Sequence, residues 1–190
     1  MSELAPHARQ YPPNFESVSQ REELVGKLKL LIRLLNAASA QYPDDQGILF
    51  RKAFANSMGH NVDLPGCASE AIKSYELLLA RTPDDKSANF YYGAFLSSTT
   101  NFRQSVPYLK KAISLGVEDA HYTLAFVYLK QNDPQSALPE FQEYLKVDPT
   151  NQTAKKMVND IENGTLKIKI TKSDLGTTGG STESASSEPK

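Results

Sequence analysis

His60, Asp63 and Cys67 lie within eight positions of one another, and a histidine, a carboxylate and a thiol can together make a cysteine nucleophile. The surrounding stretch, GHNVDLPG from Gly59 to Gly66, is rich in turn-forming residues. This composition favours a solvated loop over a reactive cluster. Cys67 follows at the expected start of a helix, a position that lowers the pKa of a thiol. Because no base is paired with it, we do not predict a nucleophile.

The other candidates for chemistry also have structural interpretations. His7, in a polar N-terminal arm, and His121, interpreted as a packing residue of a helix, have no companion at ligand spacing, so no metal site is predicted. Asp44–Asp45 and Asp84–Asp85 each follow a proline and predict helix starts, where negative charge is favourable. No phosphate-binding glycine loop, dinucleotide fingerprint or serine-hydrolase elbow occurs. The sequence therefore predicts a protein that is not an enzyme and that uses no cofactor.

The composition excludes several classes of partner. The chain has 190 residues, with 21 Lys and Arg against 22 Asp and Glu, a net charge of −1. That balance lacks the basic stripe of a nucleic-acid-binding protein. No apolar run approaches the roughly 18 residues of a membrane span, and the N-terminus lacks the apolar core of a signal peptide. We therefore expect a cytoplasmic protein, or a periplasmic or membrane-tethered one if an N-terminal signal has been removed.

One segment, from Glu118 to Pro149, has the pattern of a helix–turn–helix unit. Small and large residues mark its register at Leu124, Ala125, Tyr128, Ala137, Phe141 and Pro149. A unit this short cannot bury its apolar face alone, so neighbouring units are expected.

Two earlier segments repeat this register. Residues 86–117 repeat it 32 positions upstream, and Pro107 and Pro139 are likewise 32 positions apart. Residues 46–85 form a further copy that is longer than the others. We assign its extra length to a turn-rich insertion at 59–66, between its two helices.

These features resemble the tetratricopeptide repeat family over about residues 46–150. The segment 118–150 matches the family pattern of L-G-x2-Y, A-x3-F and a terminal proline, with Ala125 in place of glycine and His121 in place of tryptophan. The resemblance implies an all-α fold, a right-handed superhelix (α-solenoid) of about three helix pairs. The implied repeats are 46–85, 86–117 and 118–150.

Flanking helices complete a helical domain predicted over residues 19–163. Ser19 and Glu22 form a capping-box pair ahead of an apolar helix at 20–41. We expect this helix to pack on the first repeat, and its wide apolar face leaves a partner as the alternative. A capping helix is expected over 151–163, with a polar outer face that closes the array.

The two ends of the chain lie outside this domain. Residues 1–18 are polar, contain prolines and predict an irregular arm. Alternating apolar residues over 165–171 indicate an extended segment, which lies on the array, pairs with another chain or acts as a tether. The rest of 164–190 is rich in glycine, serine and threonine, a composition typical of a disordered tail.

In the family, the first helices of successive repeats line a concave groove, and this geometry would gather aromatic residues there. The implied groove residues are Phe50, Phe54, Phe90, Tyr122 and Phe126, with Arg51 and Lys130 at the rim. Contiguous exposed aromatic residues usually mark an interaction site. The alternative is that these rings pack between helices, or are covered by the arm or by residues 165–171.

The resemblance also bears on the kind of partner. The family's clamp for a C-terminal carboxylate would fall at Phe50, Phe54, Tyr91, Asp119 and Thr123, none of which is a cation. We therefore predict a non-catalytic scaffold or adaptor that binds an apolar or aromatic peptide, or a partner helix, in its groove during assembly of a larger complex. The alternative is a self-associating structural module, a homo-oligomer, whose groove is occupied in cis by its own arm or C-terminal segment.

Overall fold

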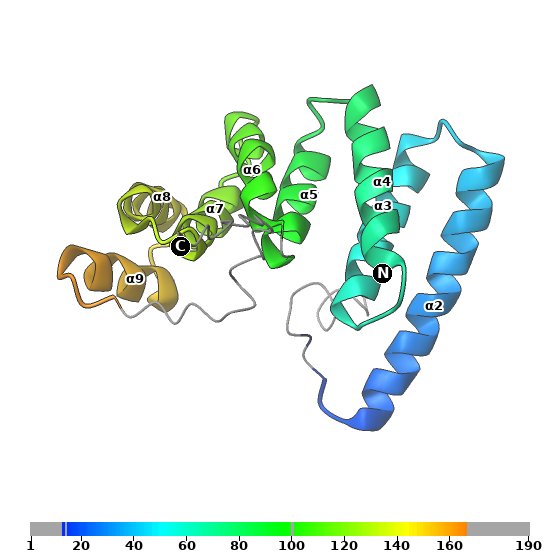
Figure 1. Cartoon of the computed structure of the whole chain (residues 1–190), viewed down its shortest axis with the longest axis horizontal. Helices are drawn as coiled ribbons and strands as arrows, with labels where there is room; N and C mark the ends of the chain where they lie inside the picture. The colour runs from blue at the N-terminus through cyan, green and yellow to red at the C-terminus, as the bar shows by residue number, and fades with distance from the viewer. Residues whose placement is uncertain (1–12, 14, 100, 167–190) are drawn as a thin grey trace, which may run out of the picture.

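The computed structural model describes residues 13, 15–99 and 101–166, and every regular element in these ranges is a helix (Figure 1). The elements in order are α2 (Val18–Gln41), α3 (Gln46–Asn61), α4 (Cys67–Arg81), α5 (Lys86–Ser98), the 3-10 helix η1 (Phe102–Gln104), α6 (Ser105–Ser114), α7 (Asp119–Lys130), α8 (Pro134–Val147) and α9 (Gln152–Glu162). Successive helices pack side by side. The predicted all-α solenoid, with about three helix pairs between an N-terminal helix and a C-terminal capping helix, is confirmed.

Alternate helices of the array share one side of the molecule. The pairs α3 with α4, α5 with α6, and α7 with α8 pack closely, and in addition α3 contacts α5 and α5 contacts α7. The first helices of the three pairs are therefore neighbours. This arrangement brings residues that are about 30 to 40 positions apart in the repeats to one surface.

Aspartate and asparagine side chains cap the N-termini of several helices of the array, among them α3, α5 and α9. Asp45 accepts a hydrogen bond from the backbone N–H of Ile48, and Asp85 accepts one from that of Ala88, each at 2.8 Å. Asn151 caps α9 in the same way. These caps satisfy N–H groups that the first helical turn leaves unpaired. The prediction that the paired aspartates mark helix starts is confirmed.

The start of α2 differs from the prediction. The N-cap is Ser17, whose Oγ accepts a hydrogen bond from the N–H of Gln20, and the Gln20 side chain accepts one from the N–H of Glu16. The predicted capping pair, Ser19 with Glu22, is therefore wrong, and Ser19 lies in the first turn. Both serines are followed three positions later by a possible capping-box partner, and the cap forms at the earlier one, with Gln20 accepting from the N–H of Glu16 in place of that of Ser17.

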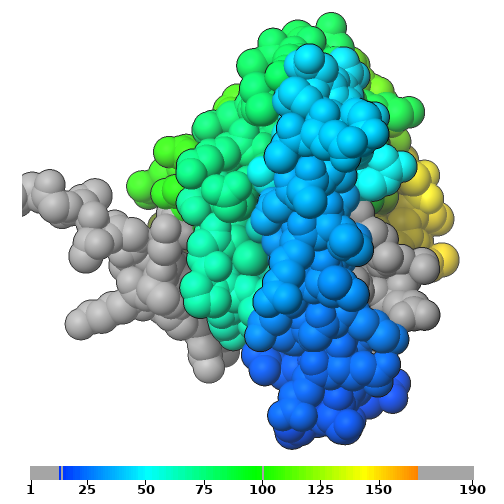
Figure 2. Space-filling view, turned by 90° about the vertical axis from the view of Figure 1, so that its right-hand side faces the viewer, coloured from blue at the N-terminus to red at the C-terminus, as the bar shows by residue number. Residues whose placement is uncertain are grey.

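Helix α2 packs on the first repeat with one face and leaves apolar residues on another. Leu24, Leu28 and Leu35 are buried in a cluster with residues of α3. Leu30 and Leu34, by contrast, are 57% and 60% exposed. In Figure 2, α2 runs down the face of the molecule that is turned to the viewer. The expected packing on the first repeat is confirmed, and the wide apolar face is only partly covered by it.

The extra length of the first repeat lies mainly in a helix, which corrects the prediction of an insertion at 59–66. Helix α3 has 16 residues, about one turn more than the 12 of α7, and only residues 62–66 connect it to α4. The added turn is possible because Gly59 has no side chain. A Cβ atom at Gly59 would lie 2.6 Å from the Sγ atom of Cys67.

Burial of Cys67 reverses the pKa shift that its place at a helix start suggested, and no nucleophile was predicted there. Its side chain is buried at the start of α4, and burial, followed by the negative charge of Glu70, raises the pKa of the thiol. Desolvation therefore outweighs the favourable effect of the helix start on the thiolate.

We expect Cys67 to react with dithionitrobenzoate at pH 8 about tenfold or more slowly in the folded protein than in denaturant. The raised folded pKa also means that the unfolded chain ionises first, so the free energy of unfolding should fall as the pH rises above about 8.5. Equal reaction rates with and without denaturant would contradict this account. A stopped-flow absorbance trace measures both rates.

The described part of the chain ends beside the last two helices. Gly164 has a positive φ of 65°, and the N–H groups of Thr165 and Leu166 both donate to the carbonyl of Asp160. Leu166 is half-buried against the cluster formed by α7, α8 and α9. The rest of the predicted extended segment and tail, and most of the predicted arm, lie outside the described residues.

Candidate partner-binding groove

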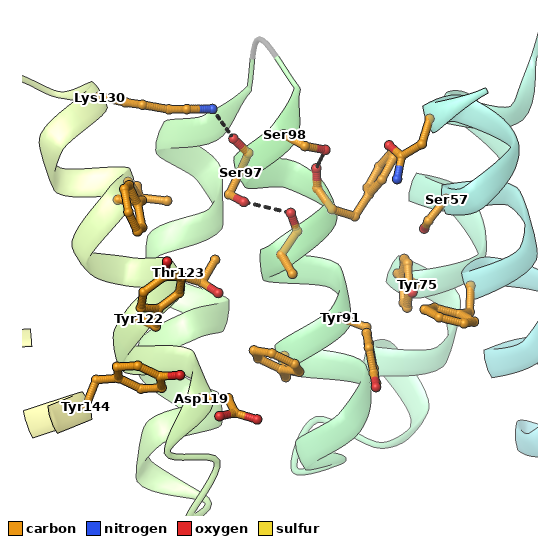
Figure 3. Close-up of a pocket in the computed structure, with 17 residues that line it drawn as sticks. Ser57, Tyr75, Tyr91, Ser97, Ser98, Asp119, Tyr122, Thr123, Lys130 and Tyr144 are labelled. Carbon is orange, nitrogen blue, oxygen red and sulfur yellow. Dashed lines mark hydrogen bonds between the residues drawn. The ribbon is translucent and has the colours of Figure 1, made fainter. Parts of the chain in front are cut away.

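The first helices of the three repeats, α3, α5 and α7, enclose a groove of about 630 Å³ (Figure 3). Tyr75 of α4 and Tyr144 of α8 complete its lining. The aromatic residues that the three first helices contribute are Phe54, Phe90, Tyr91, Phe95, Tyr122 and Phe126. The groove is thus an aromatic hollow built by all three repeats.

Five of the seven predicted groove residues line the groove. They are Phe54, Phe90, Tyr122, Phe126 and Lys130. Phe50 does not reach it: its ring lies parallel to that of Phe54 with 6.3 Å between centroids, and edge-on to Tyr75. Arg51 is exposed, and its guanidinium folds back along α3 to within 2.8 Å of where a Cβ on Gly47 would lie. The structure therefore places Phe50 behind the groove and Arg51 away from it.

The C-terminal half of α3 supplies two of the groove residues that sequence reasoning missed. Ser57 and Asn61 follow Phe54 by three and seven positions, so the three share one helix face. Phe50 lies one turn earlier and contacts Tyr91 of α5 with 5.8 Å between ring centroids, but it does not line the groove. Tyr144 was also missed because it belongs to a second helix. Its ring packs on Tyr122 with 4.8 Å between centroids.

Most of the groove rings are half-buried, with one side against the helices, whereas Phe95 and Tyr75 are buried. Phe54 lies 5.0 Å from Tyr91, and Tyr122 lies 4.9 Å from Phe126, in edge-on contacts. Phe126 also contacts the buried ring of Phe141 at 5.2 Å. Such contacts fix the rings in place, and fixed aromatic rings lose little side-chain entropy when a ligand covers them.

Comparison with known proteins identifies the repeat. Residues 118–151 match the family model for the tetratricopeptide repeat. These residues form a tetratricopeptide repeat. A crystal structure of MamA superposes on it with a TM-score of 0.65, at 15% sequence identity, over 85% of this chain and 91% of that one. The same helical-repeat fold therefore extends over most of this chain.

Two curated relatives are similar to part of this chain. The aspartyl/asparaginyl beta-hydroxylases of Homo sapiens and Mus musculus are each 30% identical to it over 98 residues. The match covers 52% of this chain and 12% of each hydroxylase. Because so little of the hydroxylases is matched, their activity is not carried over to this chain.

The two ends of the groove in this tetratricopeptide array carry opposite charges. Lys130, the last residue of α7, donates from Nζ to the carbonyl of Ser97 on α5 at 2.7 Å. Asp119, the first residue of α7, lies at the opposite end (Figure 3). At that end the pKa of Tyr144 is raised, first by burial and then by the negative charges of Asp148 and Asp119. The groove is thus electrostatically polar along α7.

Tyr75 places a hydroxyl group in an apolar setting. The residue is fully buried, and its hydroxyl has no hydrogen-bond partner among the described residues. Burial raises the pKa of this phenol, and the nearby Ser57 hydroxyl donates to the carbonyl of Ala53 instead. Phe141 takes the same register position in the last repeat. The Tyr75 hydroxyl therefore lies at a position that a phenylalanine fills in the last repeat, and it forms no hydrogen bond with the described residues.

The residues singled out as candidates for chemistry are not brought together. His60 lies edge-on to Phe95 with 5.6 Å between centroids. The Nδ1 atom of His121 lies 2.6 Å from the carboxylate of Glu140, on a side chain that is 14% exposed. Across 15–99 and 101–166, no three His, Cys, Asp or Glu residues are grouped as metal ligands. Within the same ranges, no helix is long and apolar enough to cross a membrane.

Proposed function

We propose that this chain is a non-catalytic interaction scaffold whose groove holds an apolar or aromatic segment of a partner protein, as one step in the assembly of a larger complex. The observation that carries the proposal is the ring-lined groove of about 630 Å³, built jointly by α3, α5 and α7. The tetratricopeptide fold supports it, because such repeat arrays form extended concave binding surfaces.

The physical basis is the removal of half-exposed aromatic surface from water. Each buried Å² of apolar surface contributes about 25 cal/mol, and aromatic residues dominate the binding energy of protein interfaces. The rings of Tyr122 and Phe126 are already held by neighbours, so a partner gains this area without ordering the site first. An apolar side chain or one turn of a partner helix fits a hollow of this size.

Self-association through α2 is the second candidate function. Leu30 and Leu34 lie one turn apart on α2, and both are more than half exposed. A matching α2 of another copy would cover them as an isologous dimer does. Sedimentation over a range of concentrations separates the two candidates, because only self-association makes the mass depend on the protein's own concentration.

Substitution of Ala94 by arginine tests the groove without removing a packed ring. Ala94 lines the groove from α5 and is half-buried, so a long side chain there fills the space that a partner would occupy. We expect capture of partner proteins from a source lysate to fall by about tenfold or more. The thermal midpoint should change little, since arginine favours helices nearly as well as alanine.

Ala37→Arg is the matched control, because Ala37 is exposed on α2 and lies away from the groove. Partners that both variants retain do not bind in the groove. If Ala94→Arg keeps its circular dichroism spectrum and captures every wild-type partner, the groove proposal is wrong.

A further inference from the structure

We infer that the Asp119 end of the groove binds a cationic side chain, lysine or arginine, of the partner segment. This rests on the proposed function and specifies one feature of the partner segment, its positive charge. The family's carboxylate clamp uses cations of the groove to bind an anionic group of the partner. Here the charges are reversed, because an anionic residue of the groove would bind a cationic group of the partner.

Asp119 is a carboxylate that lines the groove and has no cation close to it among the described residues. Its side chain is exposed, and among the described residues it forms no hydrogen bond and no ion pair within 4.0 Å. The cation that lines the groove, Lys130, lies eleven positions further along α7, roughly 16 Å away at 1.5 Å per residue. At that distance two charges in contact with solvent are largely screened.

Aromatic rings flank this carboxylate. Tyr122 follows Asp119 by three positions, so both side chains lie on one face of α7. Tyr144, from α8, packs on Tyr122 with 4.8 Å between centroids. Figure 3 shows Asp119, Tyr122 and Tyr144 at the same end of the pocket. A cation that approaches the carboxylate there also meets ring faces, which attract lysine and arginine.

A second carboxylate strengthens the negative potential but is already occupied. Asp148 accepts hydrogen bonds from the N–H and the hydroxyl of Thr150 and lies within reach of the Tyr144 hydroxyl. Its pKa is lowered by these bonds, so it remains charged. Burial first, and then the negative charges of Asp148 and Asp119, raise the pKa of Tyr144 at this end of the groove. Asp119 is the carboxylate that is free to bind.

The charges also set the direction of the partner. An acidic or carbonyl group of the partner would meet Lys130, whose ammonium has donors left beyond its bond to Ser97. Between the two ends, the roughly 16 Å of α7 corresponds to about five residues of extended chain. The fitting segment therefore has a basic residue at one end, apolar or aromatic residues between, and an acceptor at the other.

The test uses random dodecapeptides displayed on phage, selected on the intact chain. Groove binders are those that the Ala94→Arg variant no longer binds. We expect them to be enriched in lysine or arginine beside apolar residues. Their affinity for Asp119→Asn should be about five- to tenfold weaker, and Glu118→Gln should bind them as the wild type does. Glu118 is the matched control because it adjoins Asp119, carries the same charge and does not line the groove.

Salt gives a second readout. Between roughly 0.05 and 0.5 M NaCl, binding to the wild type should weaken more than binding to Asp119→Asn, because only the former contains the charge pair. Groove binders that bind Asp119→Asn as tightly as the wild type, or that lack basic residues, would overturn the inference and leave the proposed function intact. A selection that yields no binder sensitive to Ala94→Arg would overturn both.

Discussion

Replacing Phe141 by alanine is expected to lower the free energy of unfolding by about 3–5 kcal/mol. The ring is fully buried between α7, α8 and α9, and it touches Tyr122 and Phe126 edge-on, at 6.1 and 5.2 Å. Its removal leaves a cavity that the surrounding helices can fill only in part. Domains of this size are stable by about 5–15 kcal/mol, so the loss is a large share of the total. Urea unfolding followed by circular dichroism measures it.

Tyr75→Phe is the control for this substitution, at the same register position of the first repeat. It removes a buried hydroxyl that has no hydrogen-bond partner, while the ring that stacks on Tyr92 at 5.1 Å remains. The free energy of unfolding should stay the same or rise, because a hydroxyl left unpaired in an apolar site is destabilising. Two results would show that these repeats are not packed as described. One is a fall in the free energy of unfolding of less than about 1 kcal/mol in Phe141→Ala, and the other is a fall of more than about 1 kcal/mol in Tyr75→Phe.

Phe141 also connects stability to the groove. It is the residue behind both Tyr122 and Phe126, so the alanine variant should loosen two of the groove rings even where the helices still form. Binding through the groove would then weaken along with stability. The groove variants Ala94→Arg and Asp119→Asn differ from it in this respect, because neither removes a buried contact.

The positions of the helices were predictable because the repeats carry local signals. Asp45, Asp85 and Asn151 each bond to the N–H three residues on, and a cap of this kind depends on neighbours in the sequence alone. The start of α2 was misplaced because two overlapping cap sequences differ only in which pair of bonds forms. The end of α3 was predicted too early because the helix continues through Gly59, where the lack of a side chain leaves room for Cys67. That contact joins two helices and is not visible in a local sequence pattern.

The groove was predictable only as far as the repeat register holds. The repeat alignment put Phe90 and Tyr122 at equivalent positions, and both line the groove, because α5 and α7 occupy equivalent places in their repeats. It failed for Phe50, since the longer α3 presents its second half to the groove. It could not find Tyr144, which reaches the groove from a second helix. The unpaired state of Asp119 is a three-dimensional property, because it depends on the distance to Lys130 and on the rings around it.

Gly93 is the position where a single methyl group is expected to separate two helices. A Cβ atom there would lie 2.7 Å from Cγ of Leu109 and 3.2 Å from the Leu109 backbone N, closer than packed atoms approach. Because a backbone atom and a branched carbon are involved, α6 has to move away from α5. Gly93→Ala should therefore lower the free energy of unfolding by about 1–3 kcal/mol. The gain in helix propensity, about 1 kcal/mol, offsets only part of this strain.

The last repeat provides the reciprocal experiment, since Ala125 occupies the register position of Gly93 and is fully buried there. Ala125→Gly should lower the free energy of unfolding by about 1 kcal/mol, because glycine has a lower helix propensity and the methyl group no longer packs. A double variant, Gly93→Ala with Leu109→Val, then decides the mechanism: relief of the clash makes the combined loss smaller than the sum of the two single losses. Additive losses, or a stabilising Gly93→Ala, would mean that propensity outweighs contact at this helix pair and that α5 and α6 are less closely packed than described.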